Sequence, residues 1–215
     1  MSDLQYAVIL EGVKEVISIA GATPYVPIRS FRAWRMEGWR VSNALVPYRS
    51  IDWYVAQGRE SAYRTTQLDC EIMLHECIDE PWQNKEPHYD MMVVSPDLHP
   101  RSAGENANFV LGMSIEGVGT VLSTYRFIST ELNTRNATEC FKTTVMHELG
   151  HVFGLVKGER AMEGHWLHRQ HCPPTRRCIM RQGLSVKEWA LHTRDRLEYG
   201  PFCPDCVKDL QSFFR

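Results

Sequence analysis

The most informative segment of the chain is Met146-His147-Glu148-Leu149-Gly150-His151-Val152-Phe153-Gly154-Leu155, which contains the pattern H-E-x-x-H. Two histidines four residues apart lie on one face of a helix, about 6 Å from each other. His147 and His151 can therefore hold one metal ion between them, with Glu148 beside it. A carboxylate in this position can accept a proton from a water molecule that the metal activates. We therefore predict a metal site on a helix, with Glu148 as general base.

The residues around this pattern support a helix. Asn136, three residues before Glu139, is expected to cap its N-terminus. Gly154 is expected to end it, because glycine accepts the backbone conformation in which helices often stop. The apolar residues that recur at helical spacing and predict a buried stripe are Phe141, Val145, Leu149 and Val152. The alternative, that the two histidines are ordinary core residues, is disfavoured by this context.

The length and composition are those of an ordinary globular protein. At 215 residues, with 43% hydrophobic residues, the chain can form one well-packed domain with two lobes around a cleft. Its net charge of −2 argues against a non-specific binder of nucleic acid or of anionic membranes. No apolar run reaches about 18 residues, and the N-terminus lacks the basic start of a secretory signal. We expect a cytoplasmic monomer that binds neither nucleic acid nor membranes.

The first two thirds of the chain predict an α/β (α+β) lobe. A helix is expected at residues 66–78 and a loop at 81–87, whereas residues 4–20 fit either a helix or a strand. Three apolar segments bounded by turn residues predict strands, at residues 91–94, 108–114 and 120–123. This order of elements predicts a mixed, twisted sheet that precedes the H-E-x-x-H helix.

The chain changes character after the H-E-x-x-H segment. Residues 156–170 are mostly polar and charged. Ser185 and Glu188 then form a capping box, which predicts the start of another helix. We therefore divide a single catalytic domain into an N-terminal α/β lobe, residues 1–155, and a small C-terminal lobe, residues 156–215.

A catalytic zinc site needs a third protein ligand in addition to the two histidines. Lys157 follows Gly154 by three residues, and a protonated lysine cannot bind zinc. The later candidates are three histidines and two glutamates: His165, His168, His171, Glu159 and Glu163. These residues alone leave the choice open.

Several motifs taken together resemble the archaemetzincin family. That family has the signature H-E-x-x-H-x-x-G-x-x-H-C, followed by C-x-M and a final C-x-x-C. The matching residues after the helix are His171-Cys172, Cys178-Ile179-Met180 and Cys203-x-x-Cys206. Segments of the upstream strands, at residues 95–98, 109–112 and 123–126, also resemble the family, so that the resemblance covers roughly residues 65–206. The chain departs from the signature by an insertion of about fourteen residues before His171 and by longer gaps between the later cysteines.

The resemblance implies a zinc-dependent metallopeptidase with a metzincin-like fold, in which the active-site helix lies above the sheet. It implies that His171 completes the catalytic zinc site and that Glu148 activates the water that attacks a peptide bond. Met180 would then be the methionine of the turn packed beneath the metal. A peptide or protein substrate would pair in an extended form with the strand at residues 108–114.

The resemblance also implies a second, structural zinc that staples the C-terminal lobe, bound by Cys172, Cys178, Cys203 and Cys206. Four thiolates, two of them in a C-x-x-C knuckle, independently suit a closed tetrahedral site. Two disulfides are the competing interpretation. Buried free thiols are expected for the other cysteines, Cys70, Cys77 and Cys140. We therefore expect two zinc ions per chain.

Two other functions are compatible with these motifs. The first is a catalytically inactive metzincin-like zinc protein that serves as a peptide-binding or protein-binding module. The second is a zinc-finger-type module whose late cysteines organise a surface for nucleic acid or protein. The second leaves Glu148 unexplained, and the near-neutral net charge counts against it.

Overall fold

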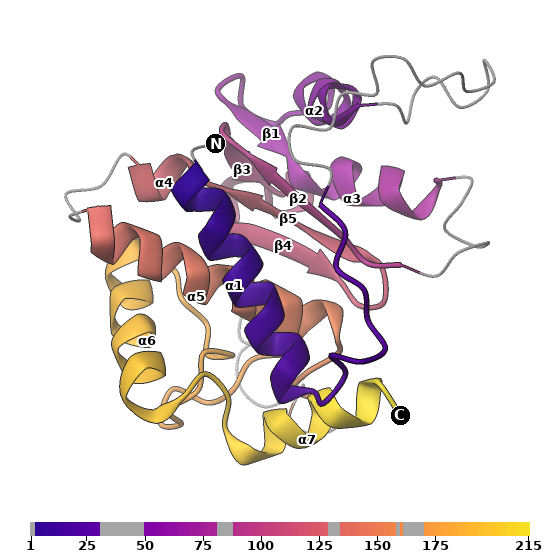
Figure 1. Ribbon diagram of the computed structural model, residues 1–215. Coiled ribbons are helices and arrows are strands. Elements are labelled where there is room, and N and C mark those ends of the chain that lie inside the picture. The colour runs from indigo at the N-terminus through magenta and orange to yellow at the C-terminus, as the bar shows by residue number, and fades with distance from the viewer. Residues whose placement is uncertain (1–2, 31–49, 81–87, 129–133, 158–159, 161–169) are drawn as a thin grey trace. The chain divides into compact units, whose positions relative to one another are not determined.

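The computed structural model describes residues 3–30, 50–80, 88–128, 134–157, 160 and 170–215 (Figure 1). The chain forms two compact units. The helical unit consists of Met1–Ile28 together with Arg126–Arg215, and the sheet unit consists of Arg29–Tyr125. These units do not correspond to the lobes predicted from the sequence, residues 1–155 and 156–215, and that division stays a prediction. The predicted loop at residues 81–87 lies outside the described residues.

The sheet unit contains two small sheets (Figure 1). In the first, β1 (Gln67–Asp69) pairs in parallel with β3 (Asp97–His99). The second has the order β2-β5-β4, with the bounds Asp90–Val94, Gly119–Ser123 and Gly112–Ile115. Because β2 runs parallel to β5 and β4 runs antiparallel to it, this sheet is mixed, as predicted. The central strand β5 is buried along its whole length, and β4 lies at an edge.

The predicted strands correspond closely to β2 and β5, but β4 begins only at Gly112, four residues later than expected. The predicted helix at residues 66–78 is also shorter, because Gln67–Asp69 form β1 instead. Helix α3 therefore begins at Cys70 and ends at Ile78. Asp69 caps it, and its side chain accepts a hydrogen bond of 3.0 Å from the backbone N–H of Glu71.

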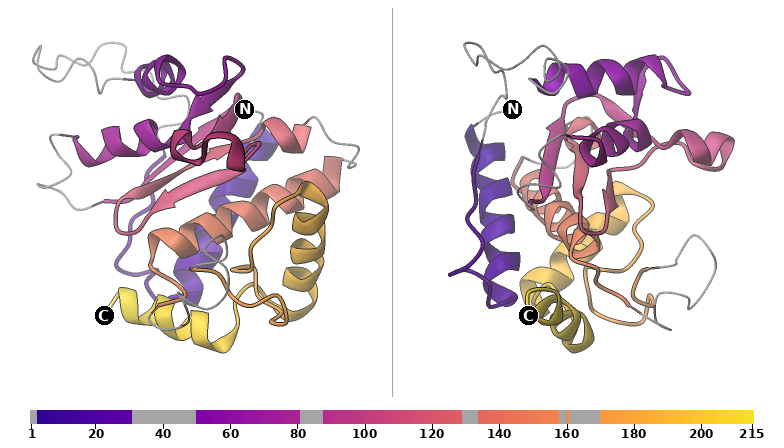
Figure 2. Two further views of the ribbon diagram at one scale, coloured as in Figure 1. Left: turned by 180° about the vertical axis from the view of Figure 1, so that it is seen from behind. Right: turned by 90° about the vertical axis from the view of Figure 1, so that its right-hand side faces the viewer.

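Helix α2 (Ile51–Glu60) packs on α3, and α3 in turn packs on β4 and β5 (Figure 2). A 3₁₀ segment, Arg101–Asn106, follows β3. The buried core that these elements share consists of Tyr54, Leu68, Cys70, Met73, Leu74, Cys77, Met92, Val94, Leu98 and Val121. Two of the cysteines interpreted as buried free thiols, Cys70 and Cys77, thus belong to this core, and Cys140 is also buried and free.

The helical unit is organised around α5 (Thr134–Val152). Helices α1 (Asp3–Ile19) and α6 (Val186–Tyr199) pack against α5, and α1 also contacts α7 (Pro204–Phe213) (Figures 1 and 2). The short α4 spans Tyr125–Ile128. The ambiguous segment at residues 4–20 is therefore helical. None of the helices within the described ranges combines the length and hydropathy that a membrane span requires.

The two ends of α5 compare differently with the sequence-based expectations. The prediction that Asn136 caps the N-terminus is wrong, because the helix already includes Thr134 and Asn136 lies in its first turn. The expected end is right: Gly154 has a φ of 61°, in the left-handed region. The N–H of Leu155 donates to the carbonyl of Gly150, and the N–H of Gly154 donates to that of His151, as in a Schellman motif.

Candidate metal centres

Three histidines converge in the helical unit. His147 and His151 lie one turn apart on α5, and the chain that follows the insertion brings His171 to them. One ring nitrogen of each histidine can serve as ligand, and these atoms all lie within 4.8 Å of one another. The Nε2 atoms of His147 and His151 are 3.1 Å apart, close to the roughly 3.3 Å between two imidazole nitrogens on one tetrahedral zinc. The arrangement fits one zinc ion held by three histidine nitrogens.

A backbone carbonyl fixes the orientation of His147. Its Nδ1 lies 2.6 Å from the carbonyl oxygen of Ile179. A carbonyl only accepts, so Nδ1 carries the proton and donates it, and Nε2 keeps its lone pair for a metal. Metal-binding histidines usually have such a partner, which holds the ring and its tautomer in place. The donor set of this structure therefore suits a zinc ion.

Burial keeps these imidazoles neutral. It lowers the pKa of His147 well below the ordinary value of 6.5, and the nearby His151 lowers it further. Burial and the nearby His171 lower the pKa of His151 to about 3. Only a neutral imidazole can bind a metal. Both rings are therefore ready to bind at neutral pH without first losing a proton.

Two side chains from the C-terminal part of the chain pack around the histidines. Trp189 of α6 meets the His147 ring edge to face, with ring centroids 4.8 Å apart, and donates a hydrogen bond to the carbonyl of Gly183. Met180 is fully buried, and a Cβ built on Gly150 would lie only 2.3 Å from its Sδ. Glycine at position 150 therefore gives Met180 its place beside α5. These contacts join segments far apart in the chain, so no local pattern predicts them.

The other residues considered for this site have distinct positions. Glu148 follows His147 on α5 and is 6% exposed. The ammonium of Lys157 lies over the ring of Phe213, 5.6 Å from its centroid, in a cation–π contact. The alternative third ligands, His165, His168, Glu159 and Glu163, lie outside the described residues.

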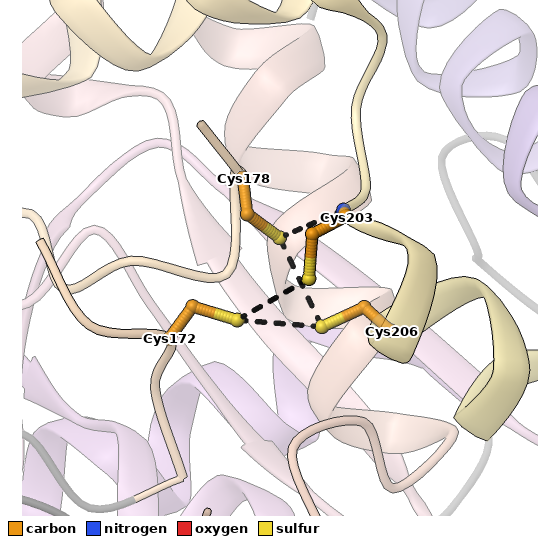
Figure 3. Close-up of side chains that lie close together, drawn as sticks. All are labelled: Cys172, Cys178, Cys203 and Cys206. Carbon is orange, nitrogen blue, oxygen red and sulfur yellow. Dashed lines mark hydrogen bonds between the residues drawn. The ribbon is translucent and has the colours of Figure 1, made fainter. Parts of the chain in front are cut away.

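Four cysteines form the second candidate centre, and Figure 3 shows their sulfur atoms turned toward one another. The Sγ of Cys172 lies 3.9 Å from that of Cys203 and 3.4 Å from that of Cys206. The Sγ of Cys178 lies 3.8 Å from that of Cys206. Zinc bonds of 2.3 Å place tetrahedral sulfurs about 3.8 Å apart. Because all four thiols are buried and free, the geometry suits one metal ion rather than two disulfides.

The two centres share one stretch of backbone. His171 and Cys172 are neighbours in the chain, one in each centre. Cys178 likewise precedes Ile179, whose carbonyl binds His147. The N–H of Cys172 donates to the carbonyl of Met180 over 2.7 Å, which closes this stretch into a loop. The cysteine centre therefore supports the residues that complete the histidine centre.

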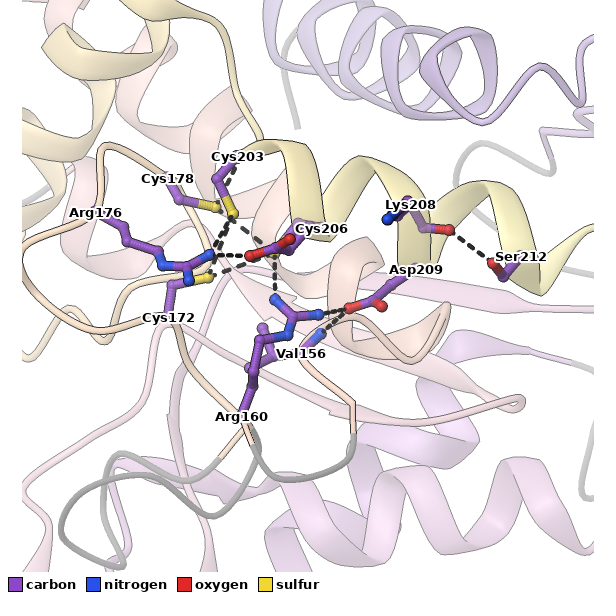
Figure 4. Close-up of polar contacts among 11 residues, drawn as sticks. Val156, Arg160, Cys172, Arg176, Cys178, Cys203, Cys206, Lys208, Asp209 and Ser212 are labelled. Atoms are coloured by element: carbon purple, nitrogen blue, oxygen red, sulfur yellow. Dashed lines mark hydrogen bonds and ion pairs between the residues drawn. The ribbon is translucent and has the colours of Figure 1, made fainter.

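Two arginines donate hydrogen bonds to the cysteine sulfurs (Figure 4). Nη1 of Arg176 lies 3.7 Å from Sγ of Cys203, and the same nitrogen pairs with Asp205 on α7. Four thiolates on a zinc ion carry a net charge of −2, and a nearby guanidinium offsets part of it.

Arg160, in the insertion, makes a second contact of this kind, with another cysteine (Figure 4). Its Nη1 lies 3.9 Å from Sγ of Cys206, and its Nη2 pairs with Asp209. Asp209 also accepts a hydrogen bond of 2.9 Å from the N–H of Val156. The insertion is thus anchored to α7 where it begins. Neither arginine stands out in the sequence, because charged residues in a polar segment look like solvated surface.

The comparisons with known proteins support the fold. No family model matches the chain, and no curated protein matches it. Archaemetzincin from Methanopyrus kandleri has a similar structure, with a TM-score of 0.51 and 21% identity, over 82% of this chain and 90% of that one. A zinc-dependent peptidase from Methanocorpusculum labreanum aligns with a TM-score of 0.47 and 16% identity, over 95% of this chain and 93% of that one.

The likeness to archaemetzincin confirms the predicted fold class. The chain has a mixed α+β fold of the archaemetzincin type, with helices and a mixed sheet. At 21% identity the likeness concerns the fold. What the chain does has to be argued from its own candidate centres.

Proposed function

We propose that this chain is a zinc-dependent metallopeptidase that hydrolyses a peptide or protein substrate. The observation that carries the proposal is the convergence of His147, His151 and His171 on one point, with Glu148 on the same helix. The rings of His147 and His151 are kept neutral by burial, and His147 is held by Ile179 with Nε2 open to a metal. The archaemetzincin type of fold and the sequence signature agree with this function.

Each residue has a definite role in the proposed reaction. A zinc ion held by the three histidines supplies a Lewis acid that polarises a peptide carbonyl and lowers the pKa of water. Glu148 accepts a proton from the attacking water and later donates it to the leaving amine nitrogen. His147 stays in its productive orientation because Ile179 holds Nδ1.

We propose a second zinc for the cysteine centre, with a structural role. Its four sulfur ligands, from Cys172, Cys178, Cys203 and Cys206, leave no open position for a substrate. Its contribution would be to hold the segment that carries His171 and Ile179. The chain would therefore bind two zinc ions in these centres.

The proposal is tested by replacing Glu148 with glutamine. Glu148→Gln keeps the size of the side chain but cannot accept the proton, so cleavage should fall by about 10²–10⁴-fold. The zinc content should stay unchanged, because the three histidines remain. The measurement combines metal analysis with mass spectrometry of a mixture of short peptides after incubation with each protein.

Glu139→Gln is the matched control, since it makes the same change in the same helix, at the ion pair with Arg196. It should keep the cleavage rate. A wild-type protein that carries both zinc ions but cleaves no peptide would instead favour the alternative, an inactive metzincin-like binding protein. A Glu148→Gln variant with unchanged turnover would exclude this residue as the base.

A further inference from the structure

A third group of potential ligands lies in the sheet unit. Cys77, Glu80 and Asp90 each offer one ligand atom, and these atoms all lie within 4.8 Å of one another. Cys77 belongs to the last turn of α3, and Asp90 is the first residue of β2. The imidazole of His88 adjoins them, with Nε2 3.1 Å from Oδ2 of Asp90 and 3.6 Å from Oε2 of Glu80. Sulfur, oxygen and nitrogen ligands thus meet where helix and strand approach each other.

Two buried carboxylate oxygens in this group lie near the His88 imidazole, but neither accepts a hydrogen bond of normal geometry within the described residues. They are Oε2 of Glu80 and Oδ2 of Asp90. Glu80 is only 3% exposed, and the hydroxyl of Tyr54 donates to its other oxygen, Oε1. Buried oxygens of this kind normally bind a donor or a cation. Both oxygens face the nitrogen of His88, so a cation among these ligands would satisfy them together.

We propose that Cys77, Glu80, His88 and Asp90 form a further metal site, and that its ion is zinc or a similar transition metal. Calcium and magnesium prefer oxygen ligands alone, whereas a thiolate and an imidazole favour zinc. Ligand atoms on a tetrahedral zinc lie roughly 3.3–3.8 Å apart. The ligand atoms of Cys77, Glu80 and Asp90 lie within 4.8 Å of one another, so these side chains would move closer together on binding an ion.

The protonation of the group agrees with a site that a cation completes. Burial raises the pKa of the Cys77 thiol and raises that of Glu80 to about 7. Burial also raises the pKa of Asp90. Without a cation, burial therefore disfavours the charged forms of these groups. A divalent ion reverses this preference, because it binds the thiolate and the carboxylates directly.

An ion at this site would link the end of α3 to the start of β2. The two elements are separated in the chain by residues 79–89, which begin with the C-cap of α3, Asp79. The role of the ion would be to stabilise the sheet unit. The site belongs to a different unit from the two candidate centres above, and the inference does not depend on the proposed peptidase activity.

Metal counting tests the inference. The wild-type protein, dialysed against zinc sulfate and then against buffer, should contain one more zinc per chain than the double variant Cys77→Ser, Asp90→Asn. Cys140→Ser is the matched control, because Cys140 is also a buried free thiol but belongs to no potential metal-binding group in the described ranges. It should keep the wild-type content. Equal content in the wild type and the double variant would overturn the inference.

A second measurement needs no variant. An anomalous difference map from crystals of the wild-type protein, collected at the zinc edge, should contain a peak bonded to Sγ of Cys77. A map with no peak there overturns the inference even if the double variant fails to fold. Failure of the proposed peptidase site would appear separately, as a missing peak between His147 and His151. The two outcomes are therefore distinguishable.

Discussion

A single backbone carbonyl decides how His147 can bind a metal. The oxygen of Ile179 accepts the proton on Nδ1, so Nε2 is the nitrogen left for a ligand. Ile179 lies between Cys178 of the cysteine centre and Met180, which packs on Gly150. A backbone group that is not itself a metal ligand thus controls the orientation of His147. At the scale of single residues, the packing around this carbonyl is where small changes should have measurable effects.

Replacing Gly150 with alanine should destabilise the helical unit. The added Cβ would lie 2.3 Å from Sδ of Met180, which is fully buried and has little room to move. Overpacking of this kind costs about 1–3 kcal/mol, and chemical denaturation would measure the loss. The control is Gly12→Ala in α1, whose new Cβ comes no closer than 3.3 Å to Val145. In Gly12→Ala the higher helix propensity of alanine should offset the loss of stability or turn it into a gain. Equal stability of Gly150→Ala and wild type would show that Met180 moves freely.

His192 should make the stability of the protein depend on pH. Burial and the nearby charge of Arg181 lower the pKa of His192 from 6.5 to about 4. Between these values the unfolded chain binds a proton that the folded chain rejects. The stabilisation is therefore present above pH 6.5 and is lost as the pH falls toward 4. The expected loss is about 3 kcal/mol.

The variant His192→Gln removes this titration, so its stability should fall less between pH 7 and pH 4 than that of the wild type. Denaturant titrations of both proteins across this range would give the free energy of unfolding at each pH. The difference between the two pH profiles isolates His192, because groups such as His147 contribute equally to both. Parallel pH profiles would mean that the His192 side chain titrates normally in the folded protein.

At the scale of elements, the two candidate centres share one segment of the chain. Residues 171–180 carry ligands of both centres, whereas α7 carries Cys206, a ligand of the cysteine centre only. Arg160 and Arg176 tie the same helix to that centre through Asp209 and Asp205. The histidine centre should therefore need the cysteine centre, whereas the cysteine centre should form without the histidines.

The variant Cys206→Ser tests this dependence, because it removes a sulfur ligand without changing residues 171–180. The structural zinc should be lost, and the zinc affinity of the histidine centre should fall by about 10–100-fold, as when supporting contacts of a metal ligand are removed. Competition with a chelating dye would measure both. In the converse variant, His151→Ala, the cysteine centre should keep its zinc. Unchanged affinity of the histidine centre in Cys206→Ser would show that residues 171–180 hold their conformation without the metal.

At the scale of the whole molecule, the N-terminal helix belongs to the unit that holds both candidate centres. Helix α1 packs along α5, and Glu15 forms an ion pair of 3.0 Å with Lys142. The carbonyl of Ile19 also accepts a hydrogen bond from Gln211 of α7. The sequence motifs that resemble archaemetzincins cover roughly residues 65–206 and leave this helix out. The structure makes it part of the same core.

A chain that begins at residue 29 should therefore fail to hold zinc in either centre, although it keeps every proposed ligand. The loss of α1 exposes its partners on α5, and each buried apolar side chain contributes about 1.5–3 kcal/mol. Those of α1 include Val8, Val16 and Ile17, and together they are comparable with the whole stability of a typical domain. Metal analysis and hydrogen exchange of the shortened chain would measure the effect. Full zinc content with native protection of α5 would contradict this account.

Local patterns were enough to predict several elements. The helix that carries His147 and His151, its end at Gly154, and the strands β2 and β5 follow from short-range periodicity and turn chemistry. The errors also lie where local signals compete. Residues 66–69 fit a helical pattern but pair with β3 instead, and Asn136 offers a cap inside a helix that had already begun.

Long-range packing was needed for the rest. Three histidines after the H-E-x-x-H helix were equally plausible as ligands by residue type, and folding brings His171 to His147 and His151. The contact of the Ile179 carbonyl with His147 and the packing of Met180 on Gly150 join segments that are distant in the chain. The physical reason is that periodicity reports which face of an element is buried. It carries no information about which distant segment will cover that face.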